Sequence, residues 1–85
     1  MEPWKLVLDE ASFRYFNNLR ADERRKVLHA LDQLKANPKQ KHHFGMTDAT
    51  GRPLSVLALR PFLITYWTDD FALEVRVLDI QRVRH

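Results

Sequence analysis

Residues 54–80 decide the fold, and they read LSVLALRPFLITYWTDDFALEVRVLDI. This segment holds three apolar, β-compatible stretches, at Leu54–Leu59, Phe62–Thr68 and Leu73–Ile80. Stretches of this length, bounded by proline or acidic residues, predict β-strands. The links between them begin at Arg60-Pro61 and Asp69-Asp70, and both are too short for a crossover. The three strands are therefore expected to be antiparallel neighbours.

Upstream of this segment, the hydrophobic pattern indicates one more strand and two helices. Trp4–Leu8 alternates with a period of two, which is typical of a strand. Asp9 can cap a helix that runs to about Arg20, and Asp22 can cap a second helix that stops at Asn37-Pro38. The residues that recur at helical spacing, and that we expect to be buried, are Phe13, Phe16, Leu19, Val27, Ala30, Leu31 and Leu34. The short joint at Arg20-Ala21 predicts an antiparallel helical hairpin.

These elements predict an α+β fold with the order β-α-α-β-β-β. A helical hairpin covering one face of a four-stranded antiparallel sheet is the compact solution. Residues 38–53 include two glycines and two prolines and are expected to form a loop. The whole chain, residues 1–85, is expected to be one domain, and the uncovered sheet face is where a ligand could lie.

Composition and charge distribution limit the classes of function. The net charge is +3, there is no cysteine, and the sequence pI is about 9.6. No apolar run approaches the roughly 20 residues of a membrane span, and the first residues lack the pattern of a signal peptide, so we expect a cytoplasmic protein. Cations gather in residues 38–45 and 80–85, whereas acids lie elsewhere. Such clusters suit phosphate or an acidic protein segment, although they can also be ordinary solvated charge.

Common catalytic and cofactor motifs are absent from the sequence. It has no phosphate-binding glycine loop and no His-Glu-x-x-His pattern, so no cofactor is expected. The four histidines lack an i,i+4 pair, so no metal site is expected either. Ser12 and Ser55 have no nearby base in the sequence, which argues against a nucleophilic triad.

The remaining candidates are cations near the ends of the predicted strands. Arg60 lies in a strand–strand link, and Arg82, Arg84 and His85 follow the last strand. A link and a neighbouring strand end can meet in an antiparallel sheet, where arginines could hold a phosphodiester and a histidine could exchange a proton. We therefore assign Arg60, Arg82 and His85 as candidate catalytic residues.

Other residues are weaker candidates. Arg84, Arg76 and Lys41 are the cations that we expect to bind the substrate. Tyr66 is a possible proton donor, although an ordinary sheet aromatic is the more common role for such a residue. Arg52 is expected to anchor the turn at residues 50–53.

The whole chain resembles the RelE/ParE toxin superfamily in element order and spacing. The residues that carry the resemblance are Leu19-x5-Arg25-x2-Leu28-x2-Leu31-x2-Leu34-x3-Pro38, Arg60-Pro61-Phe62-Leu63-Ile64-Thr65-Tyr66, and Glu74-Val75-Arg76-Val77-Leu78-Asp79-Ile80-Gln81-Arg82. The resemblance implies the toxin of a type II toxin–antitoxin pair, which cleaves ribosome-bound mRNA without a metal or inhibits DNA gyrase. It also implies an antitoxin partner, whose acids are expected to pair with Arg76, Arg82 or Arg84.

Three departures from the family pattern bear on activity. Members usually carry an arginine directly after the first aromatic of the strand, but here Leu63 follows Phe62. Leu54–Leu59 has no basic residue, and the chain lacks the C-terminal tyrosine of several nucleases. The missing strand arginine favours the alternatives, which are gyrase inhibition or a decayed toxin that only binds its antitoxin. The basic C-terminal residues favour the enzyme, and a toxin that cleaves mRNA is the first choice.

Overall fold

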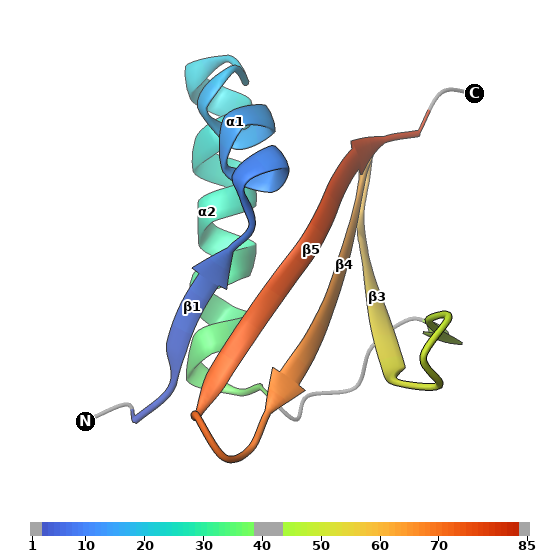
Figure 1. The fold of residues 1–85 in the computed structure, drawn as a ribbon. Helices are drawn as coiled ribbons and strands as arrows, with labels where there is room; N and C mark the ends of the chain where they lie inside the picture. The colour runs from blue at the N-terminus through green and yellow to red at the C-terminus, as the bar shows by residue number, and fades with distance from the viewer. Residues whose placement is uncertain (1–2, 39–43, 84–85) are drawn as a thin grey trace.

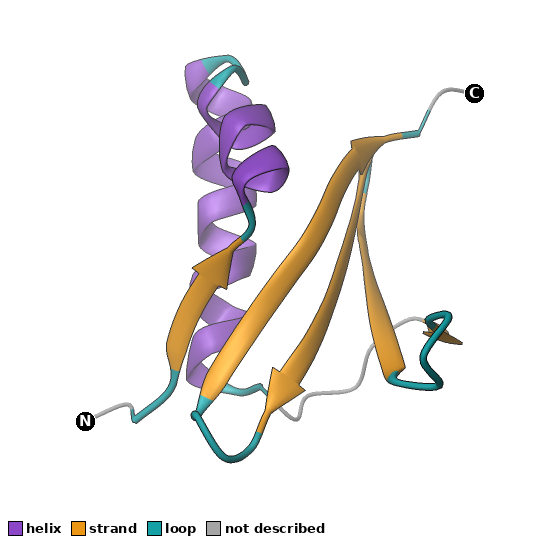
Figure 2. Cartoon of the chain, in the orientation of Figure 1, coloured by secondary structure: helices purple, strands orange, loops and turns teal. Residues whose placement is uncertain are grey.

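The computed structural model describes residues 3–38 and 44–83. Within these ranges, two helices cover one face of a five-stranded sheet (Figure 1, Figure 2). In chain order the elements are β1 (Lys5–Leu8), α1 (Glu10–Asn17), α2 (Ala21–Ala36), β2 (Phe44–Thr47), β3 (Pro53–Leu59), β4 (Phe62–Asp69) and β5 (Glu74–Arg82). Neither described helix is long and apolar enough to cross a membrane.

The sheet has the strand order β1-β5-β4-β3-β2. The α+β class, the element order and the antiparallel meander β3-β4-β5 are confirmed. The expectation of a purely antiparallel sheet is wrong, because β1 pairs with β5 in parallel. A parallel pair needs a long connection, and the chain between Leu8 and Glu74 supplies one.

The expected number of strands is also wrong, because four residues of the predicted loop form the edge strand β2. This strand pairs with β3 in antiparallel fashion, with Gly45 opposite Ser55 and Met46 opposite Leu54. A four-residue strand that contains glycine has little β-pattern of its own, so its pairing with β3 stabilises it.

The helices begin and end close to the expected residues. Asp9 caps α1, since its Oδ1 accepts a hydrogen bond of 2.8 Å from the backbone N–H of Ser12. The N-cap of α2 is Arg20 instead of Asp22, which lies in the first turn, where its charge complements the helix dipole. This helix ends at Ala36, directly before Asn37-Pro38, as expected.

The core lies between the helical hairpin and the sheet. It consists of Leu19, Val27, Ala30, Leu31, Leu34, Phe62, Ile64, Tyr66, Val75, Val77 and Ile80, with Phe16 packed against it. Phe13 is the one wrong assignment among the expected core residues, because its side chain is 56% exposed. The inward side of α1 carries Ser12 and Phe16, and one residue rotates the helix by about 100°, which turns Phe13 toward solvent.

The two faces of the sheet can be assigned from the strand register. Directly opposed residues share a face, so Ser55 and Leu57 lie with Tyr66 and Ile64 on the helix side. Leu54, Val56, Leu63, Thr65 and Trp67 then lie on the other side, which we call the open face. A register shift at Thr65/Tyr66 leaves one extra residue in β5, so that both Val77 and Ile80 point toward the helices.

Candidate functional site

The link between β3 and β4 and the end of β5 meet at one end of the sheet, as the sequence predicted. Arg82 lies opposite Phe62, and the backbone N–H of Val83 donates a hydrogen bond of 2.7 Å to the carbonyl oxygen of Pro61. Arg60 and Arg82 therefore lie on adjacent backbone segments. We call this region the cationic end of the sheet.

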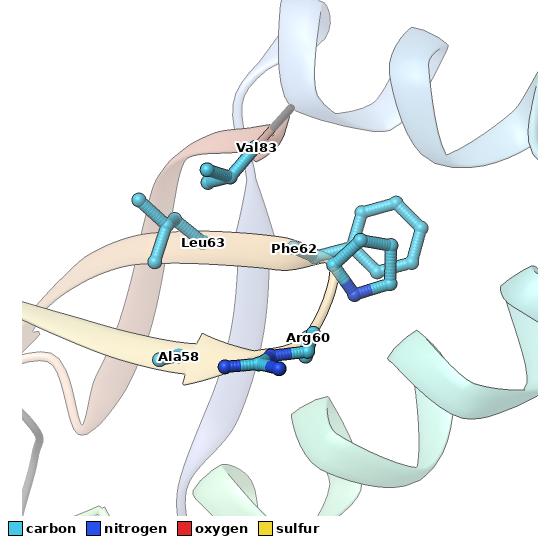
Figure 3. Close-up of a pocket in the computed structure, with 6 residues that line it drawn as sticks. Ala58, Arg60, Phe62, Leu63 and Val83 are labelled. Carbon is cyan, nitrogen blue, oxygen red and sulfur yellow. The ribbon is translucent and has the colours of Figure 1, made fainter. Parts of the chain in front are cut away.

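Arg60 borders a small pocket at the cationic end. The pocket has a volume of ≈160 Å³ and is lined by Ala58, Arg60, Pro61, Phe62, Leu63 and Val83. Figure 3 shows the Arg60 side chain extending beside Ala58, with Leu63 and Val83 across the pocket. The carbonyl oxygen of Arg60 accepts a hydrogen bond of 2.6 Å from Lys26 Nζ, which connects this link to α2. The exposed guanidinium is available to an anion that approaches the pocket.

Arg82 has a different environment, because its side chain turns toward the helices. Its Nη2 lies 2.7 Å from Oε2 of Glu23, in the first turn of α2, and its Cζ lies 5.0 Å from the centre of the Phe62 ring. The hydrogen bond that Arg82 donates to Glu23 is the main reason why the pKa of Arg82 is raised above its usual value. A phosphate that binds Nη2 must therefore replace the Glu23 carboxylate as its partner.

Arg76 does not belong to the cationic end. It precedes Arg82 by six residues along β5, a separation of about 20 Å in a strand. Its Nη1 lies 3.0 Å from Oε1 of Glu74, and its Cζ lies 5.9 Å from the centre of the Trp67 ring. Arg76, which we expected to bind the substrate, thus lies apart from Arg60 and Arg82.

A second arginine, Arg52, also contacts Trp67, and this contact was not predicted from the sequence. The Cζ of Arg52 lies 4.2 Å above the Trp67 ring, in a cation–π contact. The residue that organises the turn is Asp48, whose Oδ1 accepts hydrogen bonds from the backbone N–H groups of Thr50 and Arg52 and from the Thr50 hydroxyl. These bonds, with that of the Thr50 hydroxyl foremost, lower the pKa of Asp48. The contact of Arg52 with Trp67 depends on the pairing of β3 with β4, whereas the Asp48 hydrogen bonds are local, and the turn-forming tendency of aspartate could have indicated them.

The open face contains a groove between the cationic end and Trp67. Its volume is ≈430 Å³, and it is lined by Met46, Leu54, Val56, Leu63, Thr65, Leu78, Asp79 and Gln81. Leu63 borders both this groove and the small pocket. Among the described residues that line the groove there is no lysine or arginine, and the one charged side chain is the acid Asp79.

Tyr66 is a core residue, which matches the more common of the two roles considered for it. Its side chain is 1% exposed and lies on the helix side of the sheet, where it shares a hydrogen bond with Ser55. Burial raises the pKa of its hydroxyl, and the buried position leaves no room for a substrate. The remaining candidates, Lys41, Arg84 and His85, lie outside the described residues.

Comparison with known proteins gives matches among solved structures alone. No family model matches the chain, and no curated relative matches it. The isolated E. coli RelE toxin matches with a TM-score of 0.78 and 19% identity, over 96% of this chain and 86% of that chain. The archaeal RelE–RelB complex from Pyrococcus horikoshii OT3 matches with a TM-score of 0.76 and 13% identity, over 94% of both chains. The intact E. coli RelBE toxin–antitoxin complex matches with a TM-score of 0.74 and 20% identity, over 96% of this chain and 99% of that chain. The chain therefore has the fold of the RelE toxins.

Proposed function

We propose that this protein is the toxin of a type II toxin–antitoxin pair and that a partner encoded beside it neutralises it. The observation that carries the proposal is the similarity to RelE over 96% of the chain, with a TM-score of 0.78. Two of the similar structures are complexes of RelE with its antitoxin RelB. Exposed edge strands and a net charge of +3 suit an acidic partner segment that orders on binding.

For the target we propose messenger RNA on the ribosome. In metal-independent cleavage the 2′-hydroxyl attacks the neighbouring phosphorus, the bond to the 5′-oxygen breaks, and a cyclic phosphate and a 5′-hydroxyl form. This reaction needs a proton acceptor, a proton donor and cations that stabilise the negative charge of the transition state. Arg60 and Arg82 are the proposed cations, and His85 is the proposed proton-exchanging group, with Arg84, Arg76 and Lys41 as further contacts to the RNA.

The arrangement of the cationic end supports this assignment. Arg60 borders a pocket beside Ala58, and Arg82 lies on the adjacent strand with its side chain turned toward the helices, so one phosphate at this end would contact both guanidinium groups once Arg82 has left Glu23. Arginine binds phosphate in a bidentate manner, which also orients it. The nearby Val83 and Leu63 are apolar and would exclude water from one side of the phosphate.

A second candidate is a toxin that inhibits growth without cutting RNA, for example by binding DNA gyrase, or one that binds its antitoxin alone. The observation that favours it is the lining of the groove, where Leu63 and Asp79 lie in the middle of the open face. An RNA strand crossing this groove would meet a carboxylate instead of a cation there, which is unfavourable for a polyanion.

Controlled expression in bacteria distinguishes these candidates. We expect growth arrest and new mRNA ends on primer extension, with Arg60→Ala and Arg82→Ala each reducing cleavage by about 10²–10³, the usual effect of removing a transition-state donor. Arg25→Ala, which removes an exposed arginine of α2, is the matched control. Growth arrest with intact mRNA would favour a protein target such as gyrase, and inhibited supercoiling in vitro would identify it. If growth is unimpaired although folded protein is abundant, antitoxin binding is the one remaining candidate function. Co-purification with the neighbouring gene product tests it.

A further inference from the structure

We propose that Glu23 controls the RNA affinity of the cationic end by competing with the phosphate backbone for the guanidinium of Arg82. This inference rests on the proposed function, since it concerns the same end of the sheet. Glu23 and Arg82 are separated by 59 positions in the sequence, and their 2.7 Å contact joins the start of α2 to the end of β5. The pair therefore depends on the tertiary fold and not on local chain geometry.

The two partners differ in how easily each can leave the other. The Glu23 side chain is 14% exposed, whereas that of Arg82 is 39% exposed. A carboxylate with so little exposure is fixed in position by the packing around it, while a long arginine side chain at a strand end can rotate into solvent. The movable partner is thus Arg82.

Glu23 keeps other stabilising neighbours when Arg82 leaves. Its Oε1 lies 3.6 Å from Nε of Arg20, and it belongs to the first turn of α2, where the helix dipole favours a negative charge. Ion pairs with a buried partner are usually costly to open, because the buried charge is left without compensation. Glu23 avoids this cost, since Arg20 and the helix dipole still compensate its charge after Arg82 has left. An incoming anion can therefore replace Glu23 as the partner of Arg82.

The Phe62 ring limits where the guanidinium can rest in the ion-paired state. The Arg82 Cζ lies 5.0 Å from the ring centre, so Glu23 and Phe62 hold the side chain against the helix side of the sheet, and a side-chain hydrogen bond with Tyr15 adds to this. Without the charge of Glu23, the ionic attraction is lost and only the contacts with Phe62 and Tyr15 remain. The guanidinium would then spend more time in solvent beside Arg60, where a phosphate can bind it.

Glu23→Gln tests this proposal, because the substitution keeps the size of the side chain and removes its charge. The probe is a short fluorescein-labelled single-stranded RNA with 2′-O-methyl sugars, which the proposed chemistry cannot cleave, and binding is measured by fluorescence anisotropy. We expect binding about two- to fivefold tighter than wild type at low salt, the range that an exposed ion pair supplies. The plot of log K against log salt should also steepen by about 0.7, the value for one additional phosphate contact on a single strand.

Asp22→Asn is the matched control, because the substitution changes the net charge by the same amount. Asp22 directly precedes Glu23 and pairs with Arg20 instead of Arg82. It should leave both the affinity and the salt slope near wild type, and Glu23→Asp should keep most of the wild-type behaviour. Adding Arg82→Ala to Glu23→Gln should cancel the gain, as a double-mutant cycle requires for a direct coupling. Circular dichroism verifies that each variant is folded.

The outcomes separate this inference from the proposed function. If wild type binds the RNA but Glu23→Gln matches Asp22→Asn, the role of Glu23 is refuted while RNA binding stands. A gain that survives the removal of Arg82 would refute it as well. If neither wild type nor Glu23→Gln binds the RNA, then RNA contact at the cationic end is wrong and the proposed mRNA target fails with it.

Discussion

Replacing Leu31 by alanine should remove a large part of the stability of this protein. The Leu31 side chain is 1% exposed in the core beneath the sheet. Truncating a leucine at such a site costs about 2.7–5 kcal/mol, because the transfer energy is lost and a cavity remains. A domain of this length has a total free energy of unfolding of about 4–13 kcal/mol. The substitution therefore threatens folding itself, and the midpoint of thermal unfolding should fall by at least about 10 °C.

Leu28→Ala provides the matched control on the same helix. Leu28 is 44% exposed and loses the same atoms, and alanine has the higher helix propensity, so the cost should stay below about 1 kcal/mol. Urea unfolding followed by tryptophan fluorescence measures both variants, with an unchanged m-value indicating a two-state comparison. Equal losses for Leu28→Ala and Leu31→Ala would refute the assignment of the buried face of α2 and the core built on it.

Three further predictions concern positions outside the cationic end. Ser12→Ala should change stability by less than about 0.5 kcal/mol or increase it, because the buried Oγ has no hydrogen-bond partner; a loss above about 1 kcal/mol in urea would contradict this. The pKa of Asp48 is lowered in the folded protein, so this carboxylate stabilises the fold above the unfolded pKa of 3.8, and the contribution is lost as the pH falls through the lower folded pKa. Asp48→Asn should therefore reduce the fall in the free energy of unfolding at acid pH. An unchanged pH dependence would argue against the turn. Phe71→Ser should leave the free energy of unfolding within about 0.5 kcal/mol of wild type, because Phe71 is fully exposed at the β4–β5 link; a clear loss in urea unfolding would mean that Phe71 packs on the protein.

The parts of the fold that the sequence predicted are those that local physics determines. The meander β3-β4-β5 follows from short links, which leave no alternative to antiparallel pairing. The helix α2 follows from the spacing of Val27, Ala30, Leu31 and Leu34 and from the proline that stops it. In each case the relevant interaction lies within a few residues along the chain.

The parts that the sequence did not predict depend on contacts between distant segments. The direction of β1 is set by its pairing with β5, whose residues come more than 60 positions later. The strand β2 has a weak pattern of its own and exists by pairing with β3. Likewise, the type and position of Arg82 indicated a cation at the end of the sheet, but nothing near it in the sequence indicates Glu23 as its partner.

The middle of the open face explains why the fold alone does not identify the target. Leu63 lies opposite Ala58 on one side and Gln81 on the other, and Thr65 lies opposite Asp79, so none of these central residues carries a positive charge. The arginines of the described strands and of the links between them instead lie toward the two ends of the sheet, with Arg60 and Arg82 at one end and Arg52 and Arg76 around Trp67 at the other. A polyanion would therefore be held at the ends and not over the groove, whereas an apolar protein segment flanked by acids would match both the groove and its ends. The open face thus suits an apolar protein segment with acidic flanks better than it suits an extended RNA strand, and the proposed RNA cleavage relies on the cationic end alone.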